Sequence, residues 1–206
     1  MKYADNIAAI ATLSPDYIGF ICYHRSPRFI ADMDAGILNA IPAGVIKTAV
    51  FVNEDAETIS KLIHRYGFEA IQLHGTESPE FCGQFKGKVQ LIKAVGVDEG
   101  FDFEQLELYL NKVDYFMFDT KTVAHGGSGK TFDWTILDKY KLDVPFFLSG
   151  GLSLDNLEEV KHIGHPMLYA LDLNSKFETA PAIIDIDKLT QAFNTIKTFS
   201  SNEVRS

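Results

Sequence analysis

The sequence is poor in cysteine and lacks both a basic cluster and a long apolar run, and each absence excludes a class of function. It contains two cysteines, Cys22 and Cys82, and no segment typical of a signal peptide or a membrane span. We therefore expect a soluble, cytoplasmic protein with reduced thiols, a disulfide between the two being the alternative. The net charge is −9, which argues against a nucleic-acid partner, and the missing apolar span argues against a membrane partner.

A strand is also missing from the place where the pattern should begin. The chain opens with a short loop and a helix-like segment, and the first strand-like segment comes after them. From there, short apolar segments alternate with helical patterns, several of which start at the capping residues Asp or Ser. The predicted strands are residues 17–22, 45–52, 70–73, 89–94, 115–118, 144–148 and 167–171. The predicted helices are residues 5–13, 32–40, 55–66, 79–85, 102–111, 133–140, 154–162 and 186–199.

This alternation predicts an α/β fold with parallel strands joined by right-handed crossovers. The strands are apolar throughout, as expected when both faces of a sheet are buried. The 206 residues show no linker, so we expect residues 1–206 to form one domain. Seven strands are one short of a (β/α)₈ TIM barrel, while a flavodoxin-like sheet uses fewer, so the count alone leaves both architectures open.

One carboxylate at a strand end is the clearest chemical signal. Residues 115–118 are apolar, Asp119 follows them, and a glycine-rich loop leads to a helix start at Asp133. Catalytic residues of α/β barrels lie at the carboxyl ends of the strands, so Asp119 is our candidate catalytic residue, placed beneath a glycine-rich lid. A loop acid with a purely structural role is the alternative interpretation.

Two loops near the end of the chain have the composition of a phosphate site. Ser149-Gly150-Gly151-Leu152 follows the sixth predicted strand, and Asp172-Leu173-Asn174-Ser175 follows the seventh. Glycine loops and helix starts present backbone N–H groups to anions, and barrels commonly bind phosphate after their last two strands. We expect a phosphate group there; two tight turns without a ligand are the alternative.

A histidine and an arginine complete the set of candidates. His74 follows the third predicted strand in Gln72-Leu73-His74-Gly75, where it would contact a substrate or simply order the barrel mouth. Arg28 lies in the loop Ser26-Pro27-Arg28-Phe29, and its planar guanidinium suits a carboxylate or a phosphate. Without further context, an ordinary surface arginine is the interpretation that the residues favour for Arg28.

Together these segments resemble the phosphoribosylanthranilate isomerase family of tryptophan biosynthesis. The similar segments occur in order along nearly the whole chain and are 19–21 with 26–29, 50–53, 72–75, 118–119 with 127–134, 149–152 and 172–175. The block Gly127-Ser128-Gly129-Lys130-Thr131-Phe132-Asp133-Trp134 is the most specific of them.

The resemblance implies a TIM barrel, here incomplete, that carries out an Amadori rearrangement without a cofactor or a metal. Asp119 aligns with the general acid, which works if burial under the lid raises its pKa toward the working pH. Arg28 aligns with the residue that binds the anthranilate carboxylate. The phosphate contacts are Gly150, Gly151, Asn174 and Ser175, and further substrate contacts are His74 and Asp172, the latter to ribose hydroxyls. The expected partner is a phosphorylated small molecule.

The chain departs from the family at its start. The family's base is a cysteine at the end of a first strand, and Met1-Lys2-Tyr3-Ala4-Asp5-Asn6 resembles the segment that comes after that cysteine. A truncated chain or a misassigned start explains this best, and we expect little isomerase activity from residues 1–206. Cys22 does not align with the base, and Cys82 fits a buried small hydrophobe. The exposed barrel edges, residues 17–22 and 167–171, would favour homo-oligomers.

Two other functions compete with this interpretation. Related phosphate-binding barrels, such as indole-glycerol-phosphate synthase or ribulose-phosphate epimerase, need an essential lysine or metal-binding histidines at strand ends. Here His74 alone lies at a clean strand end, and Lys93 lacks a supporting motif. The third hypothesis is a non-catalytic protein that keeps the phosphate and carboxylate contacts without the base.

Overall fold

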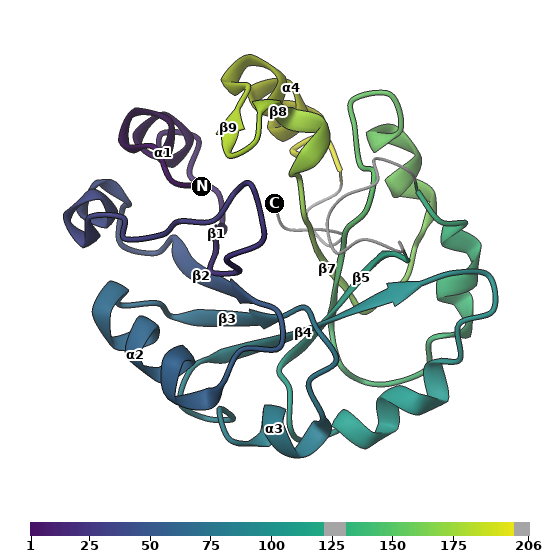
Figure 1. Cartoon of the computed structure of the whole chain (residues 1–206). Coiled ribbons are helices and arrows are strands. Elements are labelled where there is room, and N and C mark those ends of the chain that lie inside the picture. Colours follow the sequence, from purple (N-terminus) through teal and green to yellow (C-terminus); the bar gives the residue numbers. More distant parts are fainter. Residues whose placement is uncertain (122–130, 200–206) are drawn as a thin grey trace.

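Seven parallel strands form a single curled sheet in the computed structural model, which describes residues 1–121 and 131–199. The strands follow one another in chain order and curve around a common centre, with the helices outside them (Figure 1). They are β1 (Tyr17–Ile21), β2 (Ile46–Phe51), β3 (Ala70–Leu73), β4 (Gln90–Val97), β5 (Tyr115–Thr120), β6 (Phe146–Leu148) and β7 (Leu168–Leu171). The prediction of a barrel-type α/β fold with seven strands is confirmed.

The segments between the strands are a mixture of α-helices and 3₁₀-helices. The α-helices are α1 (Ala4–Ala11), α2 (Ala56–Tyr66), α3 (Pro79–Gly83) and α4 (Ile186–Ile196). The 3₁₀-helices are η1 (Ala35–Ala40), η2 (Phe103–Tyr109), η3 (Trp134–Lys139), η4 (Leu157–His162) and η5 (Ser175–Phe177). Four predicted helices, those within 32–40, 102–111, 133–140 and 154–162, are thus shorter and more tightly wound than expected.

The capping residues show how the two kinds of helix differ locally. Asp55 caps α2 by accepting from the N–H of Thr58, three residues on, as the first turn of an α-helix requires. Asp34 caps η1 by accepting from Gly36, only two residues on, and Asp133 caps η3 in the same way through Thr135. A side chain that binds the amide two residues away favours a tighter turn. Asp therefore marks where these helices start but does not decide their type.

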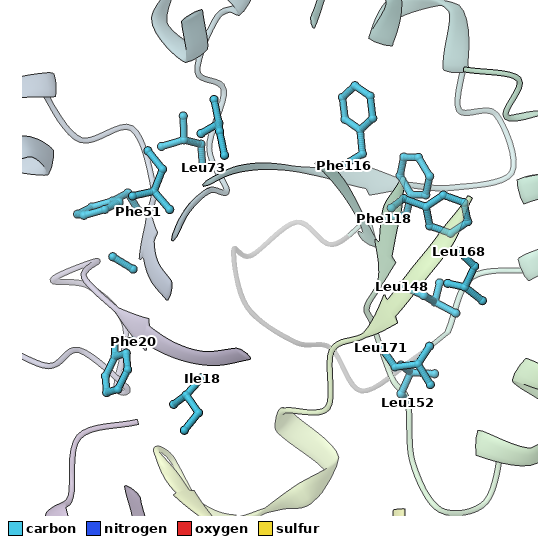
Figure 2. Close-up of a cluster of buried hydrophobic side chains, with 14 of the residues drawn as sticks. Ile18, Phe20, Phe51, Leu73, Phe116, Phe118, Leu148, Leu152, Leu168 and Leu171 are labelled. Atoms are coloured by element: carbon cyan, nitrogen blue, oxygen red, sulfur yellow. The ribbon is translucent and has the colours of Figure 1, made fainter. Parts of the chain in front are cut away.

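The main hydrophobic core lies between the sheet and the surrounding helices. Phe20, Phe51, Phe116 and Phe118 point away from the centre of the ring of strands (Figure 2), and each is essentially inaccessible to solvent. Burying a side chain of this size stabilises the fold by roughly 2–3 kcal/mol. The outward face of each strand thus belongs to this core, and the inward face is left for the barrel interior and the site.

A smaller cluster fills the barrel interior at the amino-terminal ends of the strands. Ile92, Met117 and Phe147 are its buried centre, and Tyr17 and Tyr169 pack against it. The rings of Tyr17 and Phe147 meet edge to face at 5.1 Å, and the hydroxyls of Tyr17 and Tyr169 are 3.5 Å apart. Tyr17 comes from β1 and Tyr169 from β7, so side chains connect the two ends of the sheet.

No backbone ladder joins β1 to β7 within the described residues, and these two strands are the edges of the sheet, as predicted. A hairpin that the sequence did not reveal, β8 (Glu178–Ala180) with β9 (Ile183–Ile184), lies beyond β7. The side chain of Asn6 in α1 exchanges two hydrogen bonds of 2.9 Å with the backbone of Ile184. The hairpin thereby connects the two edges from outside the sheet.

None of the helices in the described ranges combines the length and apolarity needed to cross a membrane.

Candidate active site

A pocket opens at the carboxyl ends of the strands and encloses about 230 Å³. Among the residues that line it, five polar side chains come from the carboxyl ends of β3, β5, β6 and β7: Gln72, His74, Asp119, Ser149 and Asp172. These positions lie far apart in the sequence, and the parallel sheet brings them to one edge because every strand runs in the same direction. The candidates chosen from sequence therefore converge on one site.

Asp119 lies inside this pocket at the end of β5. Its carboxylate accepts a 2.8 Å hydrogen bond from the N–H of Thr120, and the side chain is 17% exposed. Nε2 of His74 lies 3.4 Å from its Oδ2 atom. Asp119 therefore keeps solvent access on one side while a histidine faces it on the other, which suits a group that exchanges a proton with a ligand.

His74 is oriented by the residue two positions before it. The side-chain nitrogen of Gln72 lies 2.7 Å from Nδ1 of His74. An amide nitrogen only donates, so Nδ1 accepts and a neutral His74 carries its proton on Nε2, the atom that faces Asp119. The prediction that His74 contacts the substrate stays a prediction, and its proximity to Asp119 is the new observation.

The first predicted phosphate loop lies directly against Asp119. Gly150 has a φ of +89° and Gly151 a φ of +72°, conformations that favour glycine. A Cβ atom on Gly150 would lie 2.4 Å from Oγ1 of Thr120 and 2.7 Å from Oδ1 of Asp119. Glycine is thus required at position 150 both for backbone conformation and for close approach to the candidate acid.

Three backbone donors of the predicted phosphate loops face no acceptor in the part of the chain that the structure describes, whereas the N–H groups of Ser149 and Asp172 donate to the carbonyls of Phe118 and Leu148. Within residues 1–121 and 131–199, the N–H groups of Gly150, Gly151 and Asn174 make no hydrogen bond. All three residues line the pocket. An anion in the pocket would satisfy such donors, so the geometry is compatible with the predicted phosphate site.

A second carboxylate, Asp172, lies beside the first. Oγ of Ser149 donates a 2.9 Å hydrogen bond to Oδ2 of Asp172. Burial raises the pKa of Asp172 above its usual value, the nearby charge of Asp119 raises it further, and the Ser149 hydrogen bond opposes both effects. The site therefore holds two carboxyl groups in different environments, the arrangement that separates proton donors from ionised groups in enzymes.

Arg28 is not an isolated surface residue. Its Nε donates to both carboxylate oxygens of Glu178, at 2.8 and 3.0 Å, and its terminal nitrogen reaches Oε2 at 2.5 Å. The side chains of Arg28 and Glu178 are 20% and 6% exposed, and both line the pocket. The surface interpretation of Arg28 is wrong, because the β8–β9 hairpin brings a carboxylate against it. Sequence reasoning missed Glu178, since the hairpin gave no strand signal.

Both cysteines are free, as predicted, and both are buried, which was predicted only for Cys82. Sγ of Cys22 donates to the carbonyl of Phe20 at 3.6 Å, and burial raises the pKa of this thiol to about 12. Burial likewise raises the pKa of Cys82 to about 11. A thiol with so high a pKa is a poor base at neutral pH, which agrees with the expectation that neither cysteine replaces the family's base.

The glycine-rich block is only partly described. Residues 126–130 of the predicted lid lie outside the described residues, and Phe132, Asp133 and Trp134 follow within them. Phe132 is buried, and Asp133 caps η3. The part of the block that we can follow thus joins the hydrophobic core and starts the helix predicted there.

A buried ion pair near His74 was also missed, although Lys93 was noted in the sequence as a lysine without a supporting motif. Lys93 in β4 and Glu77 after β3 form an ion pair of 3.0 Å, and their side chains are 3% and 2% exposed. The signal was visible, because Lys93 interrupts an otherwise apolar strand and a lysine there needs a partner.

The described residues contain no cluster of three or more His, Cys, Asp or Glu side chains suited to a metal ion.

Comparison with known proteins agrees with the geometry. A family model described as N-(5'phosphoribosyl)anthranilate (PRA) isomerase matches residues 1–195. The N-(5'-phosphoribosyl)anthranilate isomerase of Parabacteroides distasonis is 41% identical over 92% of this chain and 87% of that protein. The enzyme of the same name from Phocaeicola vulgatus is 37% identical over 96% and 95% of the two chains.

A solved structure shows the same likeness in three dimensions. The phosphoribosyl anthranilate isomerase of Thermotoga maritima superposes with a TM-score of 0.84 at 32% identity, over 96% of this chain and 95% of that one. Sequence and fold thus agree along almost the whole length. The chain belongs to the N-(5'-phosphoribosyl)anthranilate isomerase family, the isomerases of tryptophan biosynthesis.

Proposed function

We propose that Asp119 is the general acid of an Amadori rearrangement in this protein, acting on N-(5-phosphoribosyl)anthranilate. In this reaction a proton passes to the ribose ring oxygen, the C1′–O bond breaks, and the nitrogen lone pair forms an iminium. A base then removes the C2′ proton, and the resulting enolamine tautomerises to the ketose, 1-(o-carboxyphenylamino)-1-deoxyribulose 5-phosphate. The observation that carries the proposal is the position of Asp119 between Gly150 and His74 inside the pocket.

The substrate has two negative groups, and the pocket offers a site for each. The phosphate would bind the N–H groups of Gly150, Gly151, Asn174 and Ser175, which line one side. The anthranilate carboxylate would bind Arg28, whose guanidinium is held by Glu178. Asp172 would contact the ribose hydroxyls between the two ends. A related structure, 27% identical with a TM-score of 0.74 over 94% and 92% of the chains, is described as PRAI in complex with reduced 1-(o-carboxyphenylamino)-1-deoxyribulose 5-phosphate.

The base that takes the C2′ proton is not assigned to a cysteine of this chain. Cys22 lines no part of the pocket, and the high pKa of its buried thiol disfavours the thiolate. We therefore propose that the described site binds the phosphorylated ligand well and turns it over slowly. Loss of a positioned base typically lowers a rate by about 10²–10⁴-fold.

The test measures binding and turnover separately on the same protein. Calorimetry with the reduced product analogue reports binding, and the change in anthranilate fluorescence on incubation with phosphoribosylanthranilate reports turnover. The proposal is supported if the protein binds the analogue and turns the substrate over slowly, and if Asp119→Asn abolishes that turnover. Turnover that survives Asp119→Asn unchanged would contradict the role of Asp119. Binding with no turnover at all would favour a ligand-binding protein instead of an enzyme.

We also propose that the edges β1 and β7 favour self-association. Their backbones form no ladder with each other among the described residues, and unpaired strand edges tend to pair with other chains. Light scattering over a concentration series tests this directly. A monomer at every concentration would contradict it, and the Asn6 contacts of the hairpin would then explain how the edges are protected.

A further inference from the structure

Lys93 is a charged residue in an apolar strand, and its ammonium is fully committed. Its Nζ atom lies 3.1 Å from the carbonyl oxygen of Leu73, 2.8 Å from that of Gly75 and 3.0 Å from that of Ala94. It also pairs with Oε2 of Glu77 at 3.0 Å. A buried ammonium costs several kcal/mol unless it is paired and hydrogen-bonded, so these four acceptors account for its presence. Three of the four belong to the end of β3 and the loop after it.

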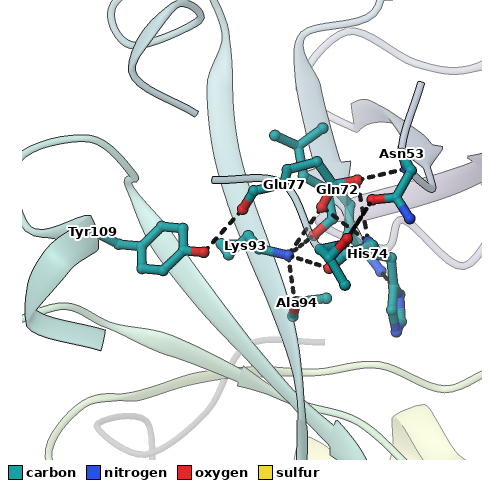
Figure 3. Close-up of polar contacts among 10 residues, drawn as sticks. Asn53, Gln72, His74, Glu77, Lys93, Ala94 and Tyr109 are labelled. Carbon is teal, nitrogen blue, oxygen red and sulfur yellow. Dashed lines mark hydrogen bonds and ion pairs between the residues drawn. The ribbon is translucent and has the colours of Figure 1, made fainter. Parts of the chain in front are cut away.

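Glu77 binds the same loop from the other side. Its Oε1 atom accepts from the N–H of Asn53 at 2.8 Å, and its Oε2 atom accepts from the N–H of Gly75 at 2.9 Å. The backbone carbonyl of Glu77 accepts a 2.9 Å hydrogen bond from the hydroxyl of Tyr109. Figure 3 shows Glu77 between Asn53, Lys93 and Tyr109, which come from three different parts of the sheet and its connections. The pair therefore ties the ends of β2 and β3 to the middle of β4.

The loop held in this way is the one that carries His74. The N–H of His74 donates to the carbonyl of Phe51 at 2.8 Å, and the N–H of Thr76 donates to Oδ1 of Asn53 at 2.7 Å. A Cβ atom on Gly75 would lie only 2.4 Å from Oδ1 of Asn53, so the loop packs closely against Asn53 and leaves no space for a side chain at position 75. His74 is thus the residue between a strand end and a clamped turn.

Because the loop after β3 is held in this way, His74 is aligned with Asp119, the candidate acid. Nε2 of His74 faces Oδ2 of Asp119 at 3.4 Å, while Gln72 holds Nδ1. Neither Lys93 nor Glu77 lines the pocket, so neither touches a ligand there. A displacement of about 1 Å in a catalytic group can lower a rate roughly 10²-fold. Residues that fix the loop thereby affect the reaction without taking part in it.

We propose that Lys93 and Glu77 are a pair of positioning residues for the isomerase reaction, which hold the β3 loop so that His74 faces Asp119. This inference rests on the proposed function. A role in stability alone explains the geometry less well, because a buried ion pair is weak support for stability and an apolar pair would serve as well. The bonds of this pair end on the loop of His74 and on the ends of the neighbouring strands.

The first test reads the imidazole of His74 directly. Long-range ¹H–¹⁵N spectra of the whole protein distinguish the Nε2–H from the Nδ1–H tautomer, and His74→Gln assigns the signal. We expect one Nε2–H form in the unaltered protein, and a mixture in Glu77→Gln and Lys93→Met. The double variant Lys93→Met/Glu77→Gln removes both charges, avoids an unpaired buried ion and should show the same mixture in a folded protein.

A matched ion pair at the opposite end of the strands provides the control. Lys47 and Glu69 lie 3.0 Å apart at the starts of β2 and β3, and Glu69→Gln is the same chemical change as Glu77→Gln. Glu69→Gln should leave the His74 signals unchanged. Unchanged His74 signals in the folded Glu77→Gln, Lys93→Met and double variants would overturn the positioning role.

The second test divides the effect between binding and turnover. The phosphate loops follow β6 and β7, away from β3, so affinity for the reduced product analogue should change little in the double variant. Turnover should fall about 10²-fold. Equal losses of affinity and turnover would contradict positioning and indicate general disruption. Failure of the unaltered protein to bind or convert its ligand would refute the proposed function instead, and the tautomer experiment would still decide the role of the pair.

Discussion

The two sides of the pocket use polar groups in opposite ways. Behind one side, next to the ends of β2 and β3, Asn53, Glu77 and the β4 residue Lys93 bond to one another and to the backbone around them. At the ends of β6 and β7, the N–H groups of Gly150 and Gly151 find no acceptor within the part of the chain that the structure describes. The first side uses its hydrogen bonds to hold its own shape, while the second keeps donors for a ligand.

This difference explains how one small site can be both ordered and able to bind. A self-satisfied network keeps its geometry when the ligand leaves, because no donor or acceptor loses a partner. Backbone donors without a protein acceptor remain available to an anion that enters the pocket. Asp119 lies where the two sides meet, with His74 on the ordered side and Gly150 on the binding side. The comparison therefore predicts that changes on the two sides have different consequences.

The largest effect on turnover is expected from a change at Asp119, where the two sides of the pocket meet. Asp119→Asn keeps the size of the side chain and removes the acid, so turnover should fall by about 10²–10⁴-fold. Affinity for the reduced product analogue should change far less, because neither predicted phosphate loop is altered. Anthranilate fluorescence and calorimetry measure the two quantities. A comparable loss of both would mean that Asp119 mainly supports ligand binding.

Glycine substitutions on the two sides should separate binding from order. Gly150→Ala places a Cβ atom 2.4 Å from Oγ1 of Thr120 at a φ of +89°, and such strain costs about 1–3 kcal/mol. We expect it to weaken analogue binding about tenfold or more. Gly75→Ala collides with Asn53 on the ordered side and should lower the melting temperature with little effect on affinity.

Gly44 supplies the control for backbone strain alone. It has a φ of +100°, and a Cβ atom there would meet nothing within 4 Å. Gly44→Ala should therefore destabilise the protein without changing analogue binding. If Gly75→Ala weakened binding as much as Gly150→Ala, the two sides would not have the separate roles that we assign to them.

A smaller effect is expected from the arginine at the far end of the pocket. Arg28→Lys keeps the charge and removes the planar fork that bonds to Glu178, so affinity for the analogue should fall roughly tenfold. Arg65→Lys is the matched control, because Arg65 pairs with Asp32 at an exposed position. Calorimetry that finds equal affinities for the Arg28 and Arg65 variants would argue against a carboxylate contact at Arg28.

The smallest effect concerns the pH dependence of stability. Burial and the neighbouring Asp119 raise the pKa of Asp172 above 3.8, its usual value. As the pH rises past 3.8, the unfolded state loses this proton first, so the free energy of unfolding falls until the folded pKa is passed and stays lower above it.

Asp172→Asn removes this loss of stability and should raise the melting temperature at pH 7, with a smaller gain near pH 4. Exposed Asp138 supplies the control, and Asp138→Asn should change the melting temperature equally at both pH values. A gain for Asp172→Asn that does not depend on pH would show that titration of this carboxyl is not its cause.

Much of the site was visible in local sequence. Strand ends carry a recognisable mark, an apolar run followed by a polar residue, and Asp119, His74 and Ser149 all follow such runs. Because parallel strands end at one edge, that mark predicts convergence without any knowledge of distances. Helix starts were also predictable, since Asp and Ser side chains cap them, although the 3₁₀ character of η1, η2 and η3 depends on which amide the cap reaches.

The sequence by itself therefore determined the parallel α/β arrangement, the seven strands and the edge on which the chemistry gathers. Only the tertiary structure decided which charges pair. Glu178 is 150 positions from Arg28 along the chain, and Glu77 is 16 from Lys93. Local patterns report periodicity and caps, which act over a few residues, whereas an ion pair forms only where the folded backbone brings two distant side chains within about 4 Å. For that reason the groups that hold the site in place came from the structure, and the groups that we propose to face the ligand came from the sequence.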